Sequence, residues 1–157
     1  MERTEFLKQT VLFNDLTTFE IIKVNKVTRT KSYGADEVIF DEGTVGDSLY
    51  IVKNGSVRVT KMENGGEEKV LAILYQGDHF GEIALVDHQT RSATVIANEN
   101  CELIQLREND FNKLLEQDKE IALKFYRSFV RVLCGRLRDT NESLTFSRTL
   151  LEQMDNE

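Results

Sequence analysis

The most informative stretch of this sequence combines closely spaced glycines with an acidic and then a basic residue. It reads Gly77-Asp78-His79-Phe80-Gly81-Glu82-Ile83-Ala84-Leu85 and, after a short gap, Thr90-Arg91-Ser92-Ala93-Thr94-Val95. A glycine turn that leads into a short helix presents unpaired backbone amides to an anion. Arg91 adds a permanent cation whose forked donors suit two phosphate oxygens. The pattern favours a phosphate-binding segment.

Two interpretations of the charged residues in this stretch follow from their chemistry. Glu82 only accepts hydrogen bonds, so beside a bound phosphate it needs a hydroxyl donor such as a ribose. Ser92 adds a hydroxyl next to the arginine. Alternatively, Glu82 and Arg91 form an ordinary ion pair with each other. The residues by themselves leave both interpretations open.

Short apolar runs on either side of this stretch predict β-structure over residues 28–107. The segments Lys53-Asn54-Gly55 and Asn64-Gly65-Gly66 are typical of hairpin turns. Strands at this spacing predict a small antiparallel barrel or sandwich, and we expect a β-barrel of jelly-roll type. The expected strands are 38–40, 49–52, 56–60, 70–74, 91–97 and 102–106.

Apolar residues at helical spacing predict one or two helices within residues 1–27 and further helices within residues 108–157. Asn109 or Asp110 is expected to cap a short helix, and Asp118 a much longer one. We therefore expect one α+β domain over residues 1–157, in which the barrel lies between the two helical segments.

The long helix has an apolar residue at every seventh position, as in a coiled coil. This repeat favours a parallel homodimer, and the alternative is a single helix folded back on its own domain. A second stripe, which includes Phe125 and Phe129, is expected to pack on the barrel. The heptad residues are Leu123, Val130, Leu137, Leu144 and Leu151.

Composition argues against several other classes of protein. A net charge of −7 argues against direct binding to nucleic acid, which relies on basic patches. No run of about 18 apolar residues is present to cross a membrane, and the first ten residues lack a secretion signal, so we expect a cytoplasmic protein. Only His79 and His88 are present, so neither a bound metal nor an enzymatic activity is expected. We expect His79 to face solvent.

The stretch at residues 77–95 resembles the phosphate-binding cassette of the cyclic-nucleotide-binding domain family. That family includes the catabolite activator protein and the regulatory subunit of cyclic-AMP-dependent protein kinase. Its apolar-apolar-x-acid-Gly segment is matched by Ile39-Phe40-Asp41-Glu42-Gly43, and the similarity runs from about Val11 to Leu144. The resemblance implies a receptor for a cyclic nucleotide.

The resemblance also implies a role for each matching residue. Glu82 would hold the ribose 2′-hydroxyl and Arg91 the cyclic phosphate. Ser92 stands where members that read cyclic GMP often carry threonine, which favours 3′,5′-cyclic AMP. Val59 and Leu71 match positions that pack on the sugar and base, with ordinary barrel core as the alternative. The cradle of backbone amides would lie near Gly81, Ile83, Ala84 and Ala93.

Part of the long helix resembles the dimer helix of the catabolite activator protein. Thr140 and Asn141 match a Thr-Ser pair that contacts adenine across the subunit boundary, and Arg136 is a further candidate or a plain surface charge. We expect a stand-alone cyclic-AMP receptor whose C-terminal helix moves on ligand binding and acts on an unknown effector protein. The alternative is a constitutive dimeric scaffold with a vestigial pocket.

Overall fold

The computed structural model describes residues 2–156, and its strands lie between two groups of helices. The N-terminal helices are α1 (Arg3–Gln9) and α2 (Thr18–Lys26). The strands are β1 (Thr28–Tyr33), β2 (Val38–Phe40), β3 (Ser48–Asn54), β4 (Val57–Met62), β5 (Glu68–Leu74), β6 (His79–Phe80), β7 (Thr94–Ala97) and β8 (Cys101–Arg107). The remaining helices are α3 (Ala84–Asp87), α4 (Glu108–Gln117) and α5 (Lys119–Asp155).

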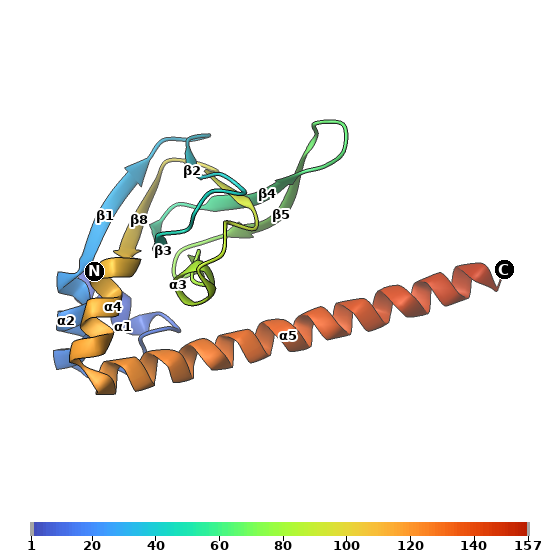
Figure 1. Ribbon diagram of the computed structural model, residues 1–157. Coiled ribbons are helices and arrows are strands. Elements are labelled where there is room, and N and C mark those ends of the chain that lie inside the picture. The colour runs from blue at the N-terminus through green and yellow to red at the C-terminus, as the bar shows by residue number, and fades with distance from the viewer. Residues whose placement is uncertain (1, 157) are drawn as a thin grey trace.

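The strands form two antiparallel four-stranded sheets. The first has the order β1-β8-β3-β6 and the second β2-β7-β4-β5, which is the jelly-roll order that the sequence predicts. The two sheets are not joined into one continuous hydrogen-bonded sheet, so the expected barrel is not closed, and the sandwich, the other predicted form, is the one observed (Figure 1). Side chains between the sheets hold them together instead, so backbone pairing at the edges is not required.

The core between the two sheets is rich in aromatic rings. The rings of Tyr50 and Phe80 stack with centroids 5.2 Å apart, and Phe40 lies within 6.1 Å of both. Val57, Val95 and Leu103 are buried beside them. This core supports the strands on which the functional site is built.

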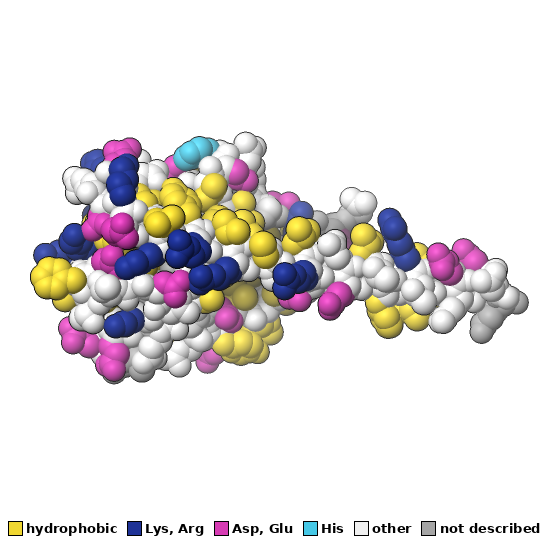
Figure 2. Space-filling view, turned by 90° about the horizontal axis from the view of Figure 1, so that it is seen from below, with side chains coloured by type: hydrophobic (Ala, Val, Ile, Leu, Met, Phe, Trp, Pro, Cys, Tyr) yellow, Lys and Arg dark blue, Asp and Glu magenta, His cyan; other side chains and the backbone are white. Residues whose placement is uncertain are grey.

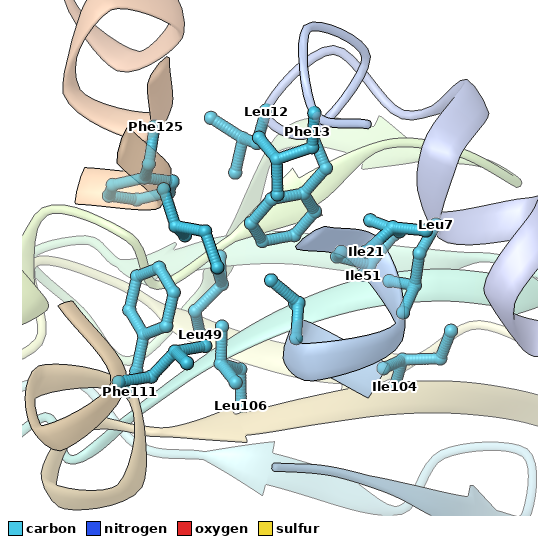
Figure 3. Close-up of a cluster of buried hydrophobic side chains, with 14 of the residues drawn as sticks. Leu7, Leu12, Phe13, Ile21, Leu49, Ile51, Ile104, Leu106, Phe111 and Phe125 are labelled. Carbon is cyan, nitrogen blue, oxygen red and sulfur yellow. The ribbon is translucent and has the colours of Figure 1, made fainter. Parts of the chain in front are cut away.

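A second core lies between the outer face of the first sheet and the helices (Figure 3). Strands β3 and β8 contribute to both cores, so apolar residues occur on both faces of each strand instead of on one face only. Phe125 of α5 stacks on Phe13 at a centroid distance of 5.9 Å and meets Phe111 edge-on at 4.7 Å. These contacts attach the start of α5 to the sandwich.

The starts of α4 and α5 differ in how they are capped. The Asp118 side chain accepts a hydrogen bond from the Ile121 amide at 3.2 Å, so the expected cap of the long helix is confirmed. The expected cap of the short helix is wrong, because α4 already begins at Glu108 and has no side-chain cap. Strand β8 runs directly into α4, which leaves Asn109 inside the first turn.

Helix α5 divides into a packed part and a projecting part (Figure 1). Phe125 and Phe129 are buried, so the predicted stripe that packs on the sandwich is confirmed. Every residue from 138 to 156 is exposed, and this half of the helix is not folded back on the domain. Within the described residues, no helix has the length and apolar character that a bilayer span needs.

Candidate functional site

A cavity of about 480 Å³ opens between the two sheets, beside the segment that the sequence analysis singled out. Strands β2, β4, β5, β6 and β7 supply apolar walls, the loop after β6 supplies polar groups, and α5 contributes one side chain. The lining residues are Phe40, Val59, Leu74, His79, Phe80, Gly81, Glu82, Ile83, Asp87, Gln89, Thr90, Arg91, Ser92, Ala93, Val95 and Arg136.

Arg91 is a buried cation, with 5% of its surface exposed. Its Nη1 donates to the carbonyl oxygen of Gly81 at 3.0 Å and its Nη2 to that of Ser48 at 2.7 Å. The guanidinium also lies 4.0 Å from the centre of the Phe40 ring. Burial lowers the pKa of Arg91, but an arginine keeps its charge in proteins. These contacts orient the guanidinium without neutralising it.

No ion pair joins Arg91 to a carboxylate in the described part of the chain. The interpretation in which Glu82 and Arg91 pair with each other is therefore wrong. A guanidinium has five N–H donors, and the two carbonyl contacts leave three for another acceptor. A buried charge without a counter-ion is costly, so the arrangement favours an anion as ligand.

Gly81 is required by its position directly over this arginine. Its φ is +80°, a conformation that L side chains rarely adopt. A Cβ atom there would lie 2.6 Å from Arg91 Nη1 and 2.9 Å from the Ser48 carbonyl oxygen. Any other residue would push the guanidinium out of place.

Glu82 is 3% exposed and pairs with α5. Its Oε1 accepts a hydrogen bond from Nη1 of Arg136, a pairing within the chain that the sequence did not predict for that arginine. Arg136 comes from the C-terminal half of the molecule and reaches the cavity through its long side chain alone. The acidic residue of the site is therefore linked directly to the long helix.

The expectation that His79 faces solvent is wrong, since only 8% of it is exposed. It belongs to β6 and pairs with Ile51 of β3, so its ring points into the site. Its Nε2 lies 3.2 Å from Nη2 of Arg136 and 3.8 Å from Oε1 of Glu82. Burial is the main cause that lowers the pKa of His79, and the positive charge of Arg136 lowers it further.

Most of the other predicted site residues also reach the cavity. Ile83, Ser92, Ala93 and Val59 line it. Ala84 begins the single-turn helix α3, and its side chain lies outside the described residues.

Leu71 was expected either to pack on the sugar and base or to belong to the barrel core. Both expectations are wrong, because Leu71 is 50% exposed and does not line the cavity. The pairing of β4 with β5 shifts there, from Val59↔Ala72 to Thr60↔Val70, and leaves Leu71 without a cross-strand partner. Leu74, further along β5, lines the cavity instead. A one-residue bulge of this kind changes which side chains face inward, and spacing in the sequence does not predict it.

Thr140 and Asn141 are exposed and do not line the cavity of their own chain. The Thr140 hydroxyl donates to the carbonyl oxygen of Arg136 at 2.9 Å, within the helix. These two residues therefore lie one turn beyond the part of α5 that touches the site.

Sequence reasoning missed several residues of the cavity wall. Phe40 was part of the matched Ile39–Gly43 segment, so a search for cation–π partners of Arg91 could have found it. Asp87 and Gln89 fall in the gap between the two quoted pieces, and no signal in the sequence marks them. No group of three or more metal-ligating residues is assembled anywhere in residues 2–156.

The sequence of this chain is similar to those of a known domain family and of several known proteins. The family model "Cyclic nucleotide-binding domain" matches residues 30–118, which is more than half of the chain. The chain is 32% identical over 138 residues to the cyclic AMP receptor protein of Thermus thermophilus, covering 88% of this chain and 62% of that protein. It is also 32% identical over 127 residues to a cGMP-dependent protein kinase of Drosophila melanogaster, covering 79% of this chain and 14% of that kinase.

The fold is similar to a solved structure as well. The crystal structure of the Thermus thermophilus catabolite activator protein superposes with a TM-score of 0.77 at 31% identity, covering 87% of this chain and 62% of that one. The chain spans less than two thirds of each of these proteins.

Proposed function

The chain belongs to the cyclic nucleotide-binding domain family, and on that premise we propose that its cavity binds 3′,5′-cyclic AMP as a regulatory signal. The observation that carries the proposal is Arg91, a buried and oriented cation with three unused donors and no carboxylate partner. A cyclic phosphate supplies one negative charge and several acceptor oxygens. Bound there, it would compensate the charge that the fold leaves open.

The remaining contacts follow from the geometry of the cavity. Glu82 still has acceptor capacity beside Arg136, and we propose that it accepts a hydrogen bond from the ribose 2′-hydroxyl. Backbone amides near Gly81, Ile83, Ala84 and Ala93 would complete the phosphate cradle. Val59 and Leu74 offer an apolar surface to the sugar and base.

Our proposal of cyclic AMP over cyclic GMP depends on both ends of the ligand. Ser92 lines the cavity and directly follows Arg91 in the sequence. Thr140 and Asn141 lie outside the cavity of their own chain, so they would contact adenine only from a second subunit. The two relatives carry different nucleotides in their names, which makes the choice of base the part to test first.

We propose a parallel homodimer in which α5 supplies the second subunit's contact. All five heptad residues of α5, from Leu123 to Leu151, are between 51% and 62% exposed in the single chain. Figure 2 shows hydrophobic side chains along the outer face of this helix, next to Lys and Arg side chains. Such a row of apolar residues is stable in water when a second helix covers it.

The ion pair between Glu82 and Arg136 connects ligand binding to this helix. A ribose hydroxyl that approaches Glu82 competes with Arg136 for the same carboxylate. We propose that this competition shifts α5 between two positions and so changes the surface offered to an effector protein. Residues 1–157 would act as one sensor domain without catalytic activity. Its free thiols, Cys101 and Cys134, suit the reducing cytoplasm.

Calorimetric titration with cyclic AMP tests the proposal, with 5′-AMP as the matched control. 5′-AMP has the same base and sugar but an open phosphate, and we expect it to bind at least about tenfold more weakly. The competing function, a dimeric scaffold with a vestigial pocket, predicts no heat with either compound. A panel of cyclic GMP and cyclic dinucleotides identifies the ligand if cyclic AMP fails.

A further inference from the structure

The ring of His79 lies between the acidic residue of the site and the one arginine that reaches it from α5. Its Nε2 is 3.2 Å from Arg136 Nη2 and 3.8 Å from Glu82 Oε1. The three side chains come from β6, the loop that follows it, and α5. His79 is therefore placed to affect the only described contact between α5 and the acidic residue of the cavity.

The chemistry of this contact determines the protonation state of His79. A guanidinium has donors and no acceptor, so Arg136 Nη2 must donate to His79 Nε2. A ring nitrogen that accepts a hydrogen bond carries no proton. The contact thus requires a neutral His79 with its single proton on Nδ1.

We infer that His79 is a positioning residue, which in its neutral form holds Arg136 on Glu82 and in its protonated form releases it. A proton on Nε2 replaces an acceptor by a donor and sets two cations against each other. The same proton makes His79 a rival of Arg136 for the carboxylate of Glu82, only 3.8 Å away. Acid would then free α5 from the cavity.

The charges around His79 act in opposite directions. Glu82 and Asp78, from its own segment, raise the pKa of His79, whereas burial and Arg136 from α5 lower it. Strand β3 contributes the uncharged Ile51 as its cross-strand neighbour. Because Arg136 and the proton exclude each other, loss of the Arg136 charge must raise the pKa of His79 by thermodynamic linkage.

A nuclear magnetic resonance titration of the ligand-free protein tests the inference directly. The chain has only two histidines, so in the His88→Gln variant all histidine signals come from His79. Long-range ¹H–¹⁵N spectra at pH 7.5 should show the Nδ1–H tautomer, and the pKa of His79 should rise in Arg136→Gln. The inference is overturned if the unmodified protein shows the Nε2–H tautomer. It is also overturned if the pKa of His79 is the same in Arg136→Gln as in the parent protein.

The effect on α5 is measured with a spin label on Cys134, which is exposed, whereas Cys101 is buried. One pH unit below the measured pKa of His79, the label in the parent protein should be more mobile than one unit above it. His79→Gln keeps an acceptor without titrating, so its label should stay immobile at both values. His79→Phe fills a similar space without an acceptor, so its label should be mobile at both. Equal behaviour of these two variants contradicts the inference.

The consequence for signalling rests on the proposed function, but the test does not. Both measurements use protein without nucleotide. If the chain binds no cyclic nucleotide and the pKa of His79 still responds to Arg136, the proposed function fails and this inference stands. If cyclic AMP binds and the pKa of His79 does not respond to Arg136, the proposed function stands and this inference fails.

Discussion

The two walls of the cavity are built in opposite ways. In the cassette wall, residues 77–95, the charged residues Glu82 and Arg91 are buried, and the arginine is held by backbone carbonyls of its own chain. The helix wall is one half-exposed side chain, Arg136, on a helix that is exposed at every residue from 138 to 155. The first wall fixes its cation by contacts within the sandwich, whereas the second is a single side chain on a projecting helix. We infer that affinity comes from the cassette wall and the response from the helix wall.

The strongest way to break the helix wall is a charge in the proposed dimer seam. Leu137→Asp would bury an unpaired carboxylate at the helix interface, which costs about 3–5 kcal/mol. We expect monomers at tens of micromolar by sedimentation, together with weaker cyclic AMP binding. Arg138→Asp, one residue further on and outside the seam, should remain dimeric. A parent protein that sediments as a monomer with and without cyclic AMP refutes the seam and the contact by the partner subunit's Thr140 together.

The strongest way to break the cassette wall is to remove its cation. Arg91→Ala should weaken cyclic AMP binding by about 2–5 kcal/mol, or roughly 30- to several-thousand-fold. The exposed Arg29 on β1 provides a control, since Arg29→Ala should bind like the parent. Glu82→Gln should cost less, because an amide oxygen still accepts from the ribose. Unchanged binding in Arg91→Ala, measured by calorimetry, would show that the cavity is not the nucleotide site.

Base preference sharpens the comparison, because it draws on both walls. We expect cyclic AMP to bind at least about tenfold more tightly than cyclic GMP, a difference of about 1.4 kcal/mol. Ser92→Thr should narrow this gap from the cassette side, and Asn141→Ala should narrow it from the helix side. Competition titrations measure the ratio for each variant. Equal affinities in the parent protein contradict the proposed preference.

The smallest expected effect is on the free energy of unfolding and comes from His79, which contacts Arg136 where the two walls meet. The pKa of His79 is lower in the folded protein than its ordinary 6.5. Between these two values the unfolded chain binds more protons, so the free energy of unfolding falls as the pH drops through this window. Urea unfolding of the parent and of His79→Gln at pH 7.5 and 5.5 should show the extra loss only in the parent. An identical loss in both would rule out His79 as its source.

Much of the fold follows from local patterns. Alternating apolar runs predict the strands, Asp118 predicts the start of α5, and the stripe with Phe125 and Phe129 predicts which face is buried. The closed barrel was wrong because closure depends on how edge strands meet, which no local pattern records. The bulge at Leu71 was missed for the same reason.

The sequence by itself determined the components of the site. Gly81 is required for the turn, Glu82 and Arg91 are the acceptor and the cation, and the heptad repeat specifies an apolar helix face. These properties depend on residue type and on spacing over a few residues, so the sequence is enough to predict them. Only the tertiary structure decided the partners. Whether Glu82 pairs with Arg91 or with Arg136, 54 positions away, is a matter of competing charges in a shared volume. The burial of His79 was likewise decided by the packing of β6 against β3 and α5, because the electrostatic environment of a side chain depends on neighbours that are distant in sequence.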